Sequence, residues 1–226
     1  MTTSGDIAAG WVTSPPTSPA GGCSSLHKDT PNLKRRLMHG GASLAVPVLS
    51  FFVPGPTLVA VAWAITATLG ILEIARFASP RVNRLFIRAF GLVMRPAEKS
   101  SMVAASTYVA LSTAIAFTVL PHAVAVTAEC FLALGDAAAG AVGERWGKTR
   151  AFGKSVEGTA AFLVAAGVAA LVLSATPGRL PIPTVAAGGI VAALTEILPL
   201  PLDDNVSVPL ISGVAMALTG AVLSSF

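Results

Sequence analysis

Three acidic residues stand among neighbours that are almost entirely apolar. Asp136 lies inside one apolar segment, and Asp203 and Asp204 lie in the short turn between two others. A charged side chain at a membrane boundary or inside a helix bundle is costly unless it binds a partner. Two carboxylate sites in such surroundings predict a bound cation. A bound cation in turn suggests phosphate chemistry, and cation transport stays open as an alternative.

A glycine-rich, basic segment follows Asp136 in the sequence. Its glycines would allow backbone N–H groups to approach phosphate oxygens, and its cations could neutralise a polyphosphate. Only three residues separate Gly143 from Gly147, whereas a Walker A loop has four at that place, so the segment is not a Walker A loop. A plain turn between two helices stays open as an alternative. The candidate nucleotide-binding residues here are Gly143, Arg145, Gly147, Lys148, Lys154 and Ser155, and Ser155 could also cap the next helix.

The composition indicates which kind of element positions these residues. Of 226 residues, 54% are hydrophobic and 12% are charged, and the mean hydropathy is +0.75. The charged fraction is about half of the roughly 25% that soluble domains carry, so we expect an integral membrane protein. The two cysteines, Cys23 and Cys130, lie in a polar tail and in an apolar segment, which excludes a cysteine-rich metal site. No nucleic-acid partner is expected.

Seven apolar runs approach the roughly 20 residues that a helix needs to cross a bilayer. They predict an all-α, polytopic membrane helix bundle of about seven transmembrane helices within residues 31–226, with six as the alternative count. Residues 1–30 are rich in Ser, Thr, Pro and Gly and are predicted to form a flexible N-terminal tail. The runs are 38–53, 57–75, 102–120, 122–142, 158–176, 182–200 and 206–225.

The basic residues predict how the bundle is oriented. Fourteen of the fifteen lysines and arginines precede the first run or follow the second and the fourth, and Arg179 alone follows the fifth. Because short cytoplasmic loops are enriched in basic residues, the N-terminus is predicted to be cytoplasmic. With seven spans, the turn of Asp203 and Asp204 falls on that cytoplasmic face. The end of the span that holds Asp136 falls there too, so the predicted active site is cytoplasmic.

Residues 80–95 predict a separate basic helix at the cytoplasmic interface. At about 100° per residue, its arginines share one face and its large apolar side chains share another. The segment could be an ordinary basic loop that fixes topology, a surface for anionic lipid or nucleotide, or a partner-binding helix. The arginines are Arg81, Arg84, Arg88 and Arg95, and the apolar residues are Val82, Phe86, Phe90 and Val93.

Several short blocks, taken together, are more specific than any one of them. They are Arg35-Arg36-Leu37-Met38-His39, Gly135-Asp136-Ala137-Ala138-Ala139, Gly143 with Gly147-Lys148, Lys154-Ser155-Val156-Glu157-Gly158, Glu196, and Asp204-Asn205-Val206-Ser207-Val208-Pro209-Leu210. In this order, residues 34–226 resemble the CTP-dependent polyprenol and lipid kinases, which include dolichol kinase, phytol and farnesol kinases, and a CTP-dependent diacylglycerol kinase. The CDP-diacylglycerol synthases are distantly similar, but residues 200–210 do not resemble their late signature. Asn205 joins the candidate nucleotide-binding residues.

This resemblance implies transfer of the γ-phosphate of CTP to the hydroxyl of a membrane lipid alcohol, with Mg²⁺ as cofactor. Asp136, Asp203 and Asp204 are then the expected metal ligands, since Mg²⁺ takes one or two carboxylates besides substrate phosphates. Glu157, Glu196 or Asp204 would accept the proton of the hydroxyl. The acceptor stays open between a polyprenol, phytol or farnesol, and diacylglycerol. The alternatives are a phosphatidate cytidylyltransferase-like enzyme and a cation- or proton-coupled transporter.

Other polar residues in apolar surroundings have local interpretations. Glu73 and Arg76 are three residues apart and predict an ion pair at the end of a span. Glu129 lies seven residues before Asp136 on nearly the same helical face, where it either supports the site or pairs with another span. His122 is expected at the opposite interface.

Overall fold

The computed structural model describes residues 33–91, 94–95, 97–176 and 178–225, with side chains from residue 40 onward. Pro31–Phe226 forms one compact unit, distinct from Met1–Thr30. The predicted tail and the side chains of residues 35–39 therefore lie outside the described part of the chain. Val93, one of the apolar residues predicted for the basic helix, lies outside it as well.

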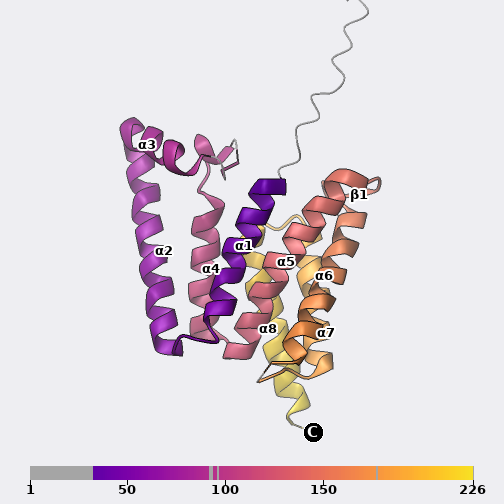
Figure 1. Ribbon diagram of the computed structural model, residues 1–226. Helices are drawn as coiled ribbons and strands as arrows, with labels where there is room; N and C mark the ends of the chain where they lie inside the picture. The colour runs from indigo at the N-terminus through magenta and orange to yellow at the C-terminus, as the bar shows by residue number, and fades with distance from the viewer. Residues whose placement is uncertain (1–32, 92–93, 96, 177, 226) are drawn as a thin grey trace, which may run out of the picture. The chain divides into compact units, whose positions relative to one another are not determined.

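The described chain is nearly all helical, as predicted, and each of the seven apolar runs coincides with a helix (Figure 1). A further helix lies within the predicted basic segment. One short 3-10 turn and a two-stranded hairpin complete the described elements. In chain order, the described helices and strands are α1 (Leu33–Leu49), α2 (Gly55–Ala78), α3 (Pro80–Phe90), η1 (Ala97–Lys99), α4 (Ala105–Val119), α5 (His122–Trp146), β1 (Arg150–Ala151), β2 (Lys154–Ser155), α6 (Val156–Ser174), α7 (Ile182–Ile197) and α8 (Asp204–Leu223).

Four of these helices, α2, α5, α6 and α8, are long and apolar enough to cross a membrane. The apolar part of α1, Gly40–Leu49, and the helices α4 and α7 are shorter. At about 1.5 Å per residue, the 15 residues of α4 extend only about 22 Å, which is less than a hydrocarbon core of roughly 30 Å. Length and composition therefore indicate an integral membrane protein with four helices able to span the bilayer, and they do not establish the predicted seven spans.

Prolines and capping side chains set where the helices begin. Pro54, Pro121 and Pro181 directly precede α2, α5 and α7, because a fixed φ near −65° suits the start of a helix but not its interior. The hydroxyl of Ser155 accepts a hydrogen bond from the Gly158 N–H at 3.1 Å. The predicted Ser155 cap of α6 is thus confirmed.

Helix α5 forms the centre of the bundle and contacts α1, α4, α6, α7 and α8. It is the most deeply buried of the four long apolar helices. Small residues let the neighbouring helices approach it, as expected for helix packing in lipid. A Cβ at Gly135 would lie 2.4 Å from the ring of Phe162 on α6, so this glycine makes room for a buried aromatic side chain. Cys130 packs in the same core, where it is 8% exposed.

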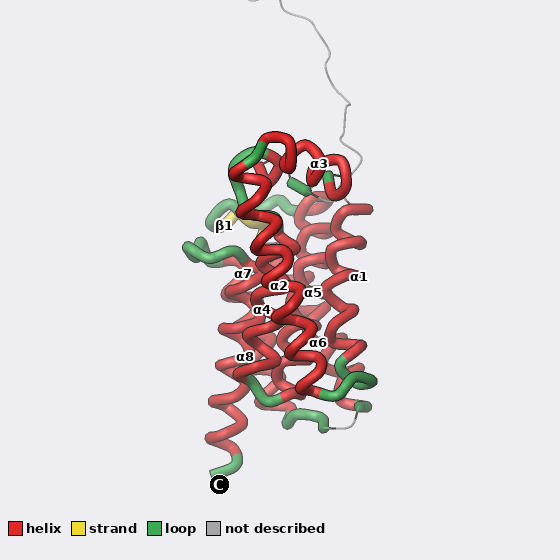
Figure 2. Tube along the Cα trace, turned by 90° about the vertical axis from the view of Figure 1, so that its left-hand side faces the viewer, coloured by secondary structure: helices red, strands yellow, loops and turns green. Residues whose placement is uncertain are grey.

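Arg76 joins α2 to the segment that crosses one end of the bundle (Figure 2). Its Nη2 lies 2.6 Å from Glu73 Oε2, which confirms the predicted ion pair. Its Nη1 donates to the carbonyl of Glu98 at 2.9 Å, and its Nη2 donates to that of Met102 at 2.5 Å. Phe86 of α3 covers the guanidinium, 5.2 Å from the ring centroid. A fully buried arginine thereby fixes α3 across the end of α2.

Candidate functional site

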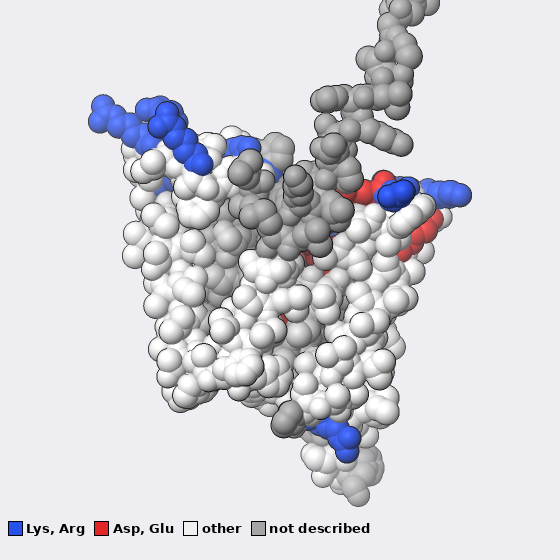
Figure 3. Space-filling model, viewed as in Figure 1, with Lys and Arg blue, Asp and Glu red and all other residues white. Residues whose placement is uncertain are grey.

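Most of the basic side chains gather at the end of the bundle that carries α3 and the β-hairpin, and another lies at the opposite end (Figure 3). Two contacts show that both basic segments reach the start of α8. Arg95 Nη1 lies 3.9 Å from Asp203 Oδ2, and Lys154 Nζ lies 2.7 Å from Asp204 Oδ2. The connections before α4, before α6 and before α8 therefore share one end of the bundle, as the charge pattern predicted.

Lys154 is the centre of a cluster with two acids that lie 42 and 50 positions further along the sequence. Its ammonium group contacts Asp204, donates to the backbone carbonyl of Glu196, and lies 3.5 Å from Glu196 Oε1. The side chain of Lys154 is 31% exposed, and those of Glu196 and Asp204 are 10% and 36% exposed. We call these three residues the Lys154 cluster. It places a cation between two carboxylates at a partly open surface.

The two glutamates predicted as proton acceptors differ in their surroundings. Glu196 is buried, and Thr159 Oγ1 donates to its Oε2 at 3.3 Å. Glu157 instead accepts hydrogen bonds from the backbone N–H of Thr149 at 3.0 and 3.3 Å, which ties the hairpin to the start of α6. The structure thus brings Glu196 into the Lys154 cluster, and it gives Glu157 a role in the loop.

A tight hairpin positions Lys154. Strands β1 and β2 pair antiparallel, with Arg150 opposite Ser155 and Ala151 opposite Lys154. The two residues between the strands, Phe152 and Gly153, have φ of 52° and 88°. Two consecutive positive φ angles are typical of the type I′ turns that close two-residue hairpins. Gly153 adopts such a φ without steric cost, whereas Phe152 is strained there and is exposed to solvent.

The predicted phosphate-binding glycines pack around Ser155. A Cβ at Gly143 would lie 2.5 Å from Ser155 Oγ, and one at Gly147 would lie 2.7 Å from Ser155 Cβ. The Gly147 N–H donates to the Gly143 carbonyl at 3.2 Å, so it ends α5 and does not point into open space. In the structure these glycines allow close packing of α5 against the start of α6. Their role toward phosphate stays a prediction.

The other predicted nucleotide-binding cations lie on the surface beside the cluster. Arg145 and Lys148 are exposed, and Arg145 stacks over the ring of Trp146 at 5.1 Å. Arg150, at the start of the hairpin, is exposed as well. Within the described residues, none of the three forms an ion pair with Glu196 or Asp204. They form an exposed basic surface next to Lys154.

The remaining predicted acids lie near Asp204 in different ways. Asp203 caps α8, since its Oδ1 accepts from the backbone N–H and the side-chain Nδ2 of Asn205 at 3.0 and 2.6 Å. Asn205 is buried. Asp136, on α5, lies within electrostatic range of Asp204. The three predicted metal ligands therefore come from the same region, but Asp203 already serves the helix start.

The carboxylates of this region fit one form of magnesium site. Among the described residues, no three His, Cys, Asp or Glu side chains form a ready-made metal site. Mg²⁺ in phosphate-transfer enzymes needs only one or two carboxylates, because substrate phosphates and waters complete its octahedron. Asp204 with Asp136 nearby suits a magnesium ion that arrives with a polyphosphate, and does not suit a cage made by the protein alone.

Two residues of the site were not predicted from the sequence. Arg95, expected only as part of a basic helix, lies between Glu98 Oε1 at 3.6 Å and Asp203. Thr159 was not singled out, although it lies four residues after Ser155 and shares its side of α6. A polar residue one helical turn after Ser155 was the pattern in the sequence that could have identified Thr159.

Neither a family model nor a curated protein nor a solved structure matches the chain.

Glu129 lies away from the cluster, in the middle of α5. It is fully buried, and neither carboxylate oxygen has a hydrogen-bond partner of ordinary geometry among the described residues. The side chain of Thr113 on α4 lies beside its carboxyl group. His122, at the other end of α5, is exposed, and its Nε2 lies 3.2 Å from the carbonyl of Ser50.

Proposed function

We propose that the protein is an integral-membrane, CTP-dependent lipid kinase, which transfers the γ-phosphate of CTP to the hydroxyl of a membrane lipid alcohol. The observation that carries this proposal is the Lys154 cluster. It joins a cation from a glycine-rich basic loop to acids from two other segments. The same residues belong to the blocks that resemble the polyprenol and lipid kinases. Polyprenol, phytol or farnesol, and diacylglycerol are the candidate acceptors.

In this proposal all seven apolar helices cross the membrane, and the end with the Lys154 cluster faces the cytoplasm. The excess of lysine and arginine at that end supports this orientation. Single cysteines at the exposed positions Ser100, Thr149 and Leu202, in a background without Cys23 and Cys130, should react with an impermeant thiol reagent only from the cytoplasmic side. A cysteine replacing the exposed Ala175 should react only from the other side. Labelling of Leu202→Cys from outside would refute the shared cytoplasmic site.

Asp204 and Asp136 would hold Mg²⁺ together with the phosphates of CTP. The ion supplies charge neutralisation for the triphosphate. Lys154 balances Asp204 before the nucleotide arrives, and a cation on Asp204 would free the ammonium group to contact a phosphate oxygen. Arg145 and Lys148 would attract the triphosphate from solution, since exposed cations act mainly through long-range attraction. In phosphoryl transfer such positioning and charge neutralisation dominate catalysis.

The reaction also needs a group that takes the hydroxyl proton. The hydroxyl oxygen of the lipid forms a bond to the γ-phosphorus, the bond from that phosphorus to the bridging oxygen breaks, and CDP leaves. Glu196 is our choice to accept the proton, because Glu157 is bonded to the hairpin and Asp204 would hold the metal. Thr159 orients Glu196 through its hydroxyl.

Incubation of the purified protein with γ-labelled CTP and a panel of lipid alcohols tests the proposal. We expect a labelled lipid phosphate and released CDP in the presence of Mg²⁺. Asp204→Asn, which keeps shape but removes charge, should lower turnover by orders of magnitude while the protein stays folded. Release of pyrophosphate with phosphatidate would instead identify a cytidylyltransferase. Absence of either product with every acceptor would overturn the assignment.

The position of Glu129 favours a second candidate function, which is proton- or cation-coupled transport. A fully buried acid that has no hydrogen bond of ordinary geometry among the described residues is costly in an apolar helix, and many such acids lie on ion pathways. If Glu129 carries a proton, liposomes should show a flux that needs no nucleotide and that Glu129→Gln abolishes. If the protein is only a kinase, Glu129→Gln should leave turnover unchanged.

A further inference from the structure

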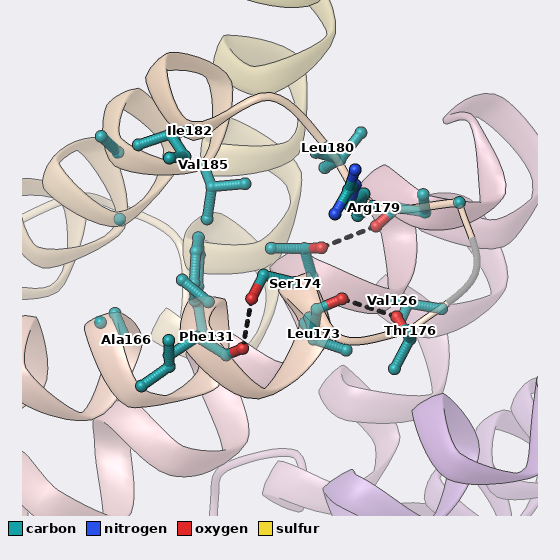
Figure 4. Close-up of a pocket in the computed structure, with 18 of the residues that line it drawn as sticks. Val126, Phe131, Ala166, Leu173, Ser174, Thr176, Arg179, Leu180, Ile182 and Val185 are labelled. Atoms are coloured by element: carbon teal, nitrogen blue, oxygen red, sulfur yellow. Dashed lines mark hydrogen bonds between the residues drawn. The ribbon is translucent and has the colours of Figure 1, made fainter.

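An apolar groove lies at the end of the bundle opposite the Lys154 cluster. It is formed by the start of α5, the second half of α6 and the first half of α7, and its volume is about 680 Å³ (Figure 4). That volume falls within the roughly 300–1,000 Å³ of typical ligand pockets. We call it the α6–α7 groove. Phe131 and Val126 of α5, which are both buried, form its back wall.

Small residues create the hollow. Gly167 and Ala170 on α6 face Ala186 and Gly189 on α7 across the groove, where larger side chains would fill the space. A Cβ added at Gly167 would meet nothing within 4 Å. The α6 wall from Leu163 to Ser174 extends about 16 Å at the usual rise of about 1.5 Å per residue. That length is close to half of a hydrocarbon core of roughly 30 Å, which is the depth of one leaflet.

The hydroxyl groups that line the groove already donate to their own helices. Thr127 Oγ1 donates to the carbonyl of Ala123 at 2.7 Å. Ser174 Oγ and Thr176 Oγ1 donate to carbonyls three residues earlier, at 2.6 and 2.7 Å (Figure 4). These bonds leave the walls of the groove effectively apolar.

Arg179 is the one fully charged residue that lines the groove among the described residues. It lies in the connection between α6 and α7, is exposed, and forms no ion pair or hydrogen bond within the described part of the chain. Figure 4 shows it beside Leu180, above the hydroxyl groups of Ser174 and Thr176. Long apolar walls with an unpaired cation at one end match an amphiphile with an apolar chain and an anionic head.

The groove is separate from the proposed catalytic site. Along α6, Phe162 lies between Thr159, which contacts Glu196, and Leu163, where the groove begins. The ring of Phe162 is fully buried against Gly135 of α5. A lipid in the groove therefore enters from the leaflet opposite the Lys154 cluster and does not reach the carboxylates.

We propose that the α6–α7 groove binds one acyl chain of an anionic lipid from that leaflet, with its negatively charged head on Arg179. Neutral lipid would cover the same walls without preference, because apolar contact alone does not distinguish head groups. The charge of Arg179 provides the selectivity. This site does not depend on the proposed kinase activity.

Electron spin resonance of the full-length protein in nanodiscs of neutral phosphatidylcholine tests this site without nucleotide. The probe is stearic acid, spin-labelled near the end of its chain and ionised at pH 8, compared with its methyl ester. We expect the protein to immobilise the acid with about tenfold higher affinity than the ester, the effect of one charge-assisted contact. Arg179→Gln should reduce the affinity for the acid to that for the ester and leave the ester unchanged.

Two matched variants separate this groove from other lipid contacts. Gly167→Leu should displace both probes, because its side chain would fill the groove. Gly70→Leu on α2, where a Cβ also meets nothing within 4 Å, should displace neither. Arg84→Gln removes an exposed arginine of α3 and should not change the preference for the acid. Equal binding of acid and ester, a preference that survives Arg179→Gln, or equal effects of the two glycine variants would overturn the proposal.

Discussion

Replacement of Lys154 by methionine should weaken the fold as well as any activity, because its ammonium group has three protein contacts. It lies 2.7 Å from Asp204 Oδ2, donates to the carbonyl of Glu196, and lies 3.5 Å from the carboxylate of that residue. Methionine keeps an unbranched side chain that ends at Cε and removes the ammonium group with its charge and donors. Two carboxylates would then face each other without the cation between them.

The magnitude follows from the burial of the partners. A hydrogen bond to a charged group contributes about 1.5–3 kcal/mol, and an exposed ion pair contributes less than about 1 kcal/mol. Lys154 and Asp204 are each about one third exposed, so we assign about 1–2 kcal/mol to their contact. Glu196 is buried and would lose its cation, which adds about 1–2 kcal/mol. Lys154→Met should therefore lower the free energy of unfolding by about 2–4 kcal/mol, or Tm by about 5–15 °C.

A double-mutant cycle with Asp204→Asn isolates the contact. Unfolding in detergent can be followed with a thiol-reactive dye in a Cys23→Ser background, where buried Cys130 becomes accessible only on unfolding. The double variant should lose about 1–2 kcal/mol less than the sum of the single variants. Lys148→Met, which removes an exposed lysine of the same loop, should be additive with Asp204→Asn. Additivity within about 0.5 kcal/mol for the Lys154 pair would refute the contact.

Three further substitutions test separate parts of the fold by the same unfolding assay. Arg76→Met should cost about 3–5 kcal/mol, since it breaks a buried ion pair, and a loss below about 1 kcal/mol would contradict the role of this residue in fixing α3. Gly135→Ala should cost about 1–3 kcal/mol through a clash with Phe162, whereas Gly70→Ala should be nearly neutral, and equal effects would refute the packing. Phe152→Asn should stabilise the hairpin by about 1 kcal/mol, because asparagine tolerates a positive φ, and a loss of stability would show that the aromatic ring has a partner.

The sequence predicted the features that depend on neighbours in the chain. The seven helices follow from apolar runs divided by prolines, and the Glu73–Arg76 pair and the Ser155 cap follow from helical spacing. The number of membrane spans does not follow from the apolar runs in the same way, because α4 is too short to cross by length alone. Charge asymmetry alone predicted that the basic segments and the start of α8 lie at one end of the bundle. In the structure, Arg95 and Lys154 from two of these segments contact the aspartates at the start of α8.

Other features of the site could not be predicted. The sequence gives Gly143 and Gly147 the composition of a phosphate-binding loop, yet their small size serves the packing of Ser155. The positive φ of Phe152 is equally hidden, since phenylalanine is disfavoured in that conformation and no local pattern signals it. Glu196, and not Glu157, contacts Lys154 because of the way the hairpin packs beside α6 and α7. The residue types alone do not predict that packing.

The two adjacent aspartates at the start of α8 have different partners, so one supports the fold and the other belongs to the proposed site. Asp203 caps the helix through Asn205 and approaches Arg95 on the side of α3, so it anchors α8 within the bundle. Asp204 points to Lys154 instead. A cation or phosphate that draws Lys154 away from Asp204 would leave the anchor at Asp203 in place. The proposed site can therefore exchange its internal ion pair for a ligand without loss of the helix start that positions it, and Asp203→Asn should affect stability more than nucleotide use.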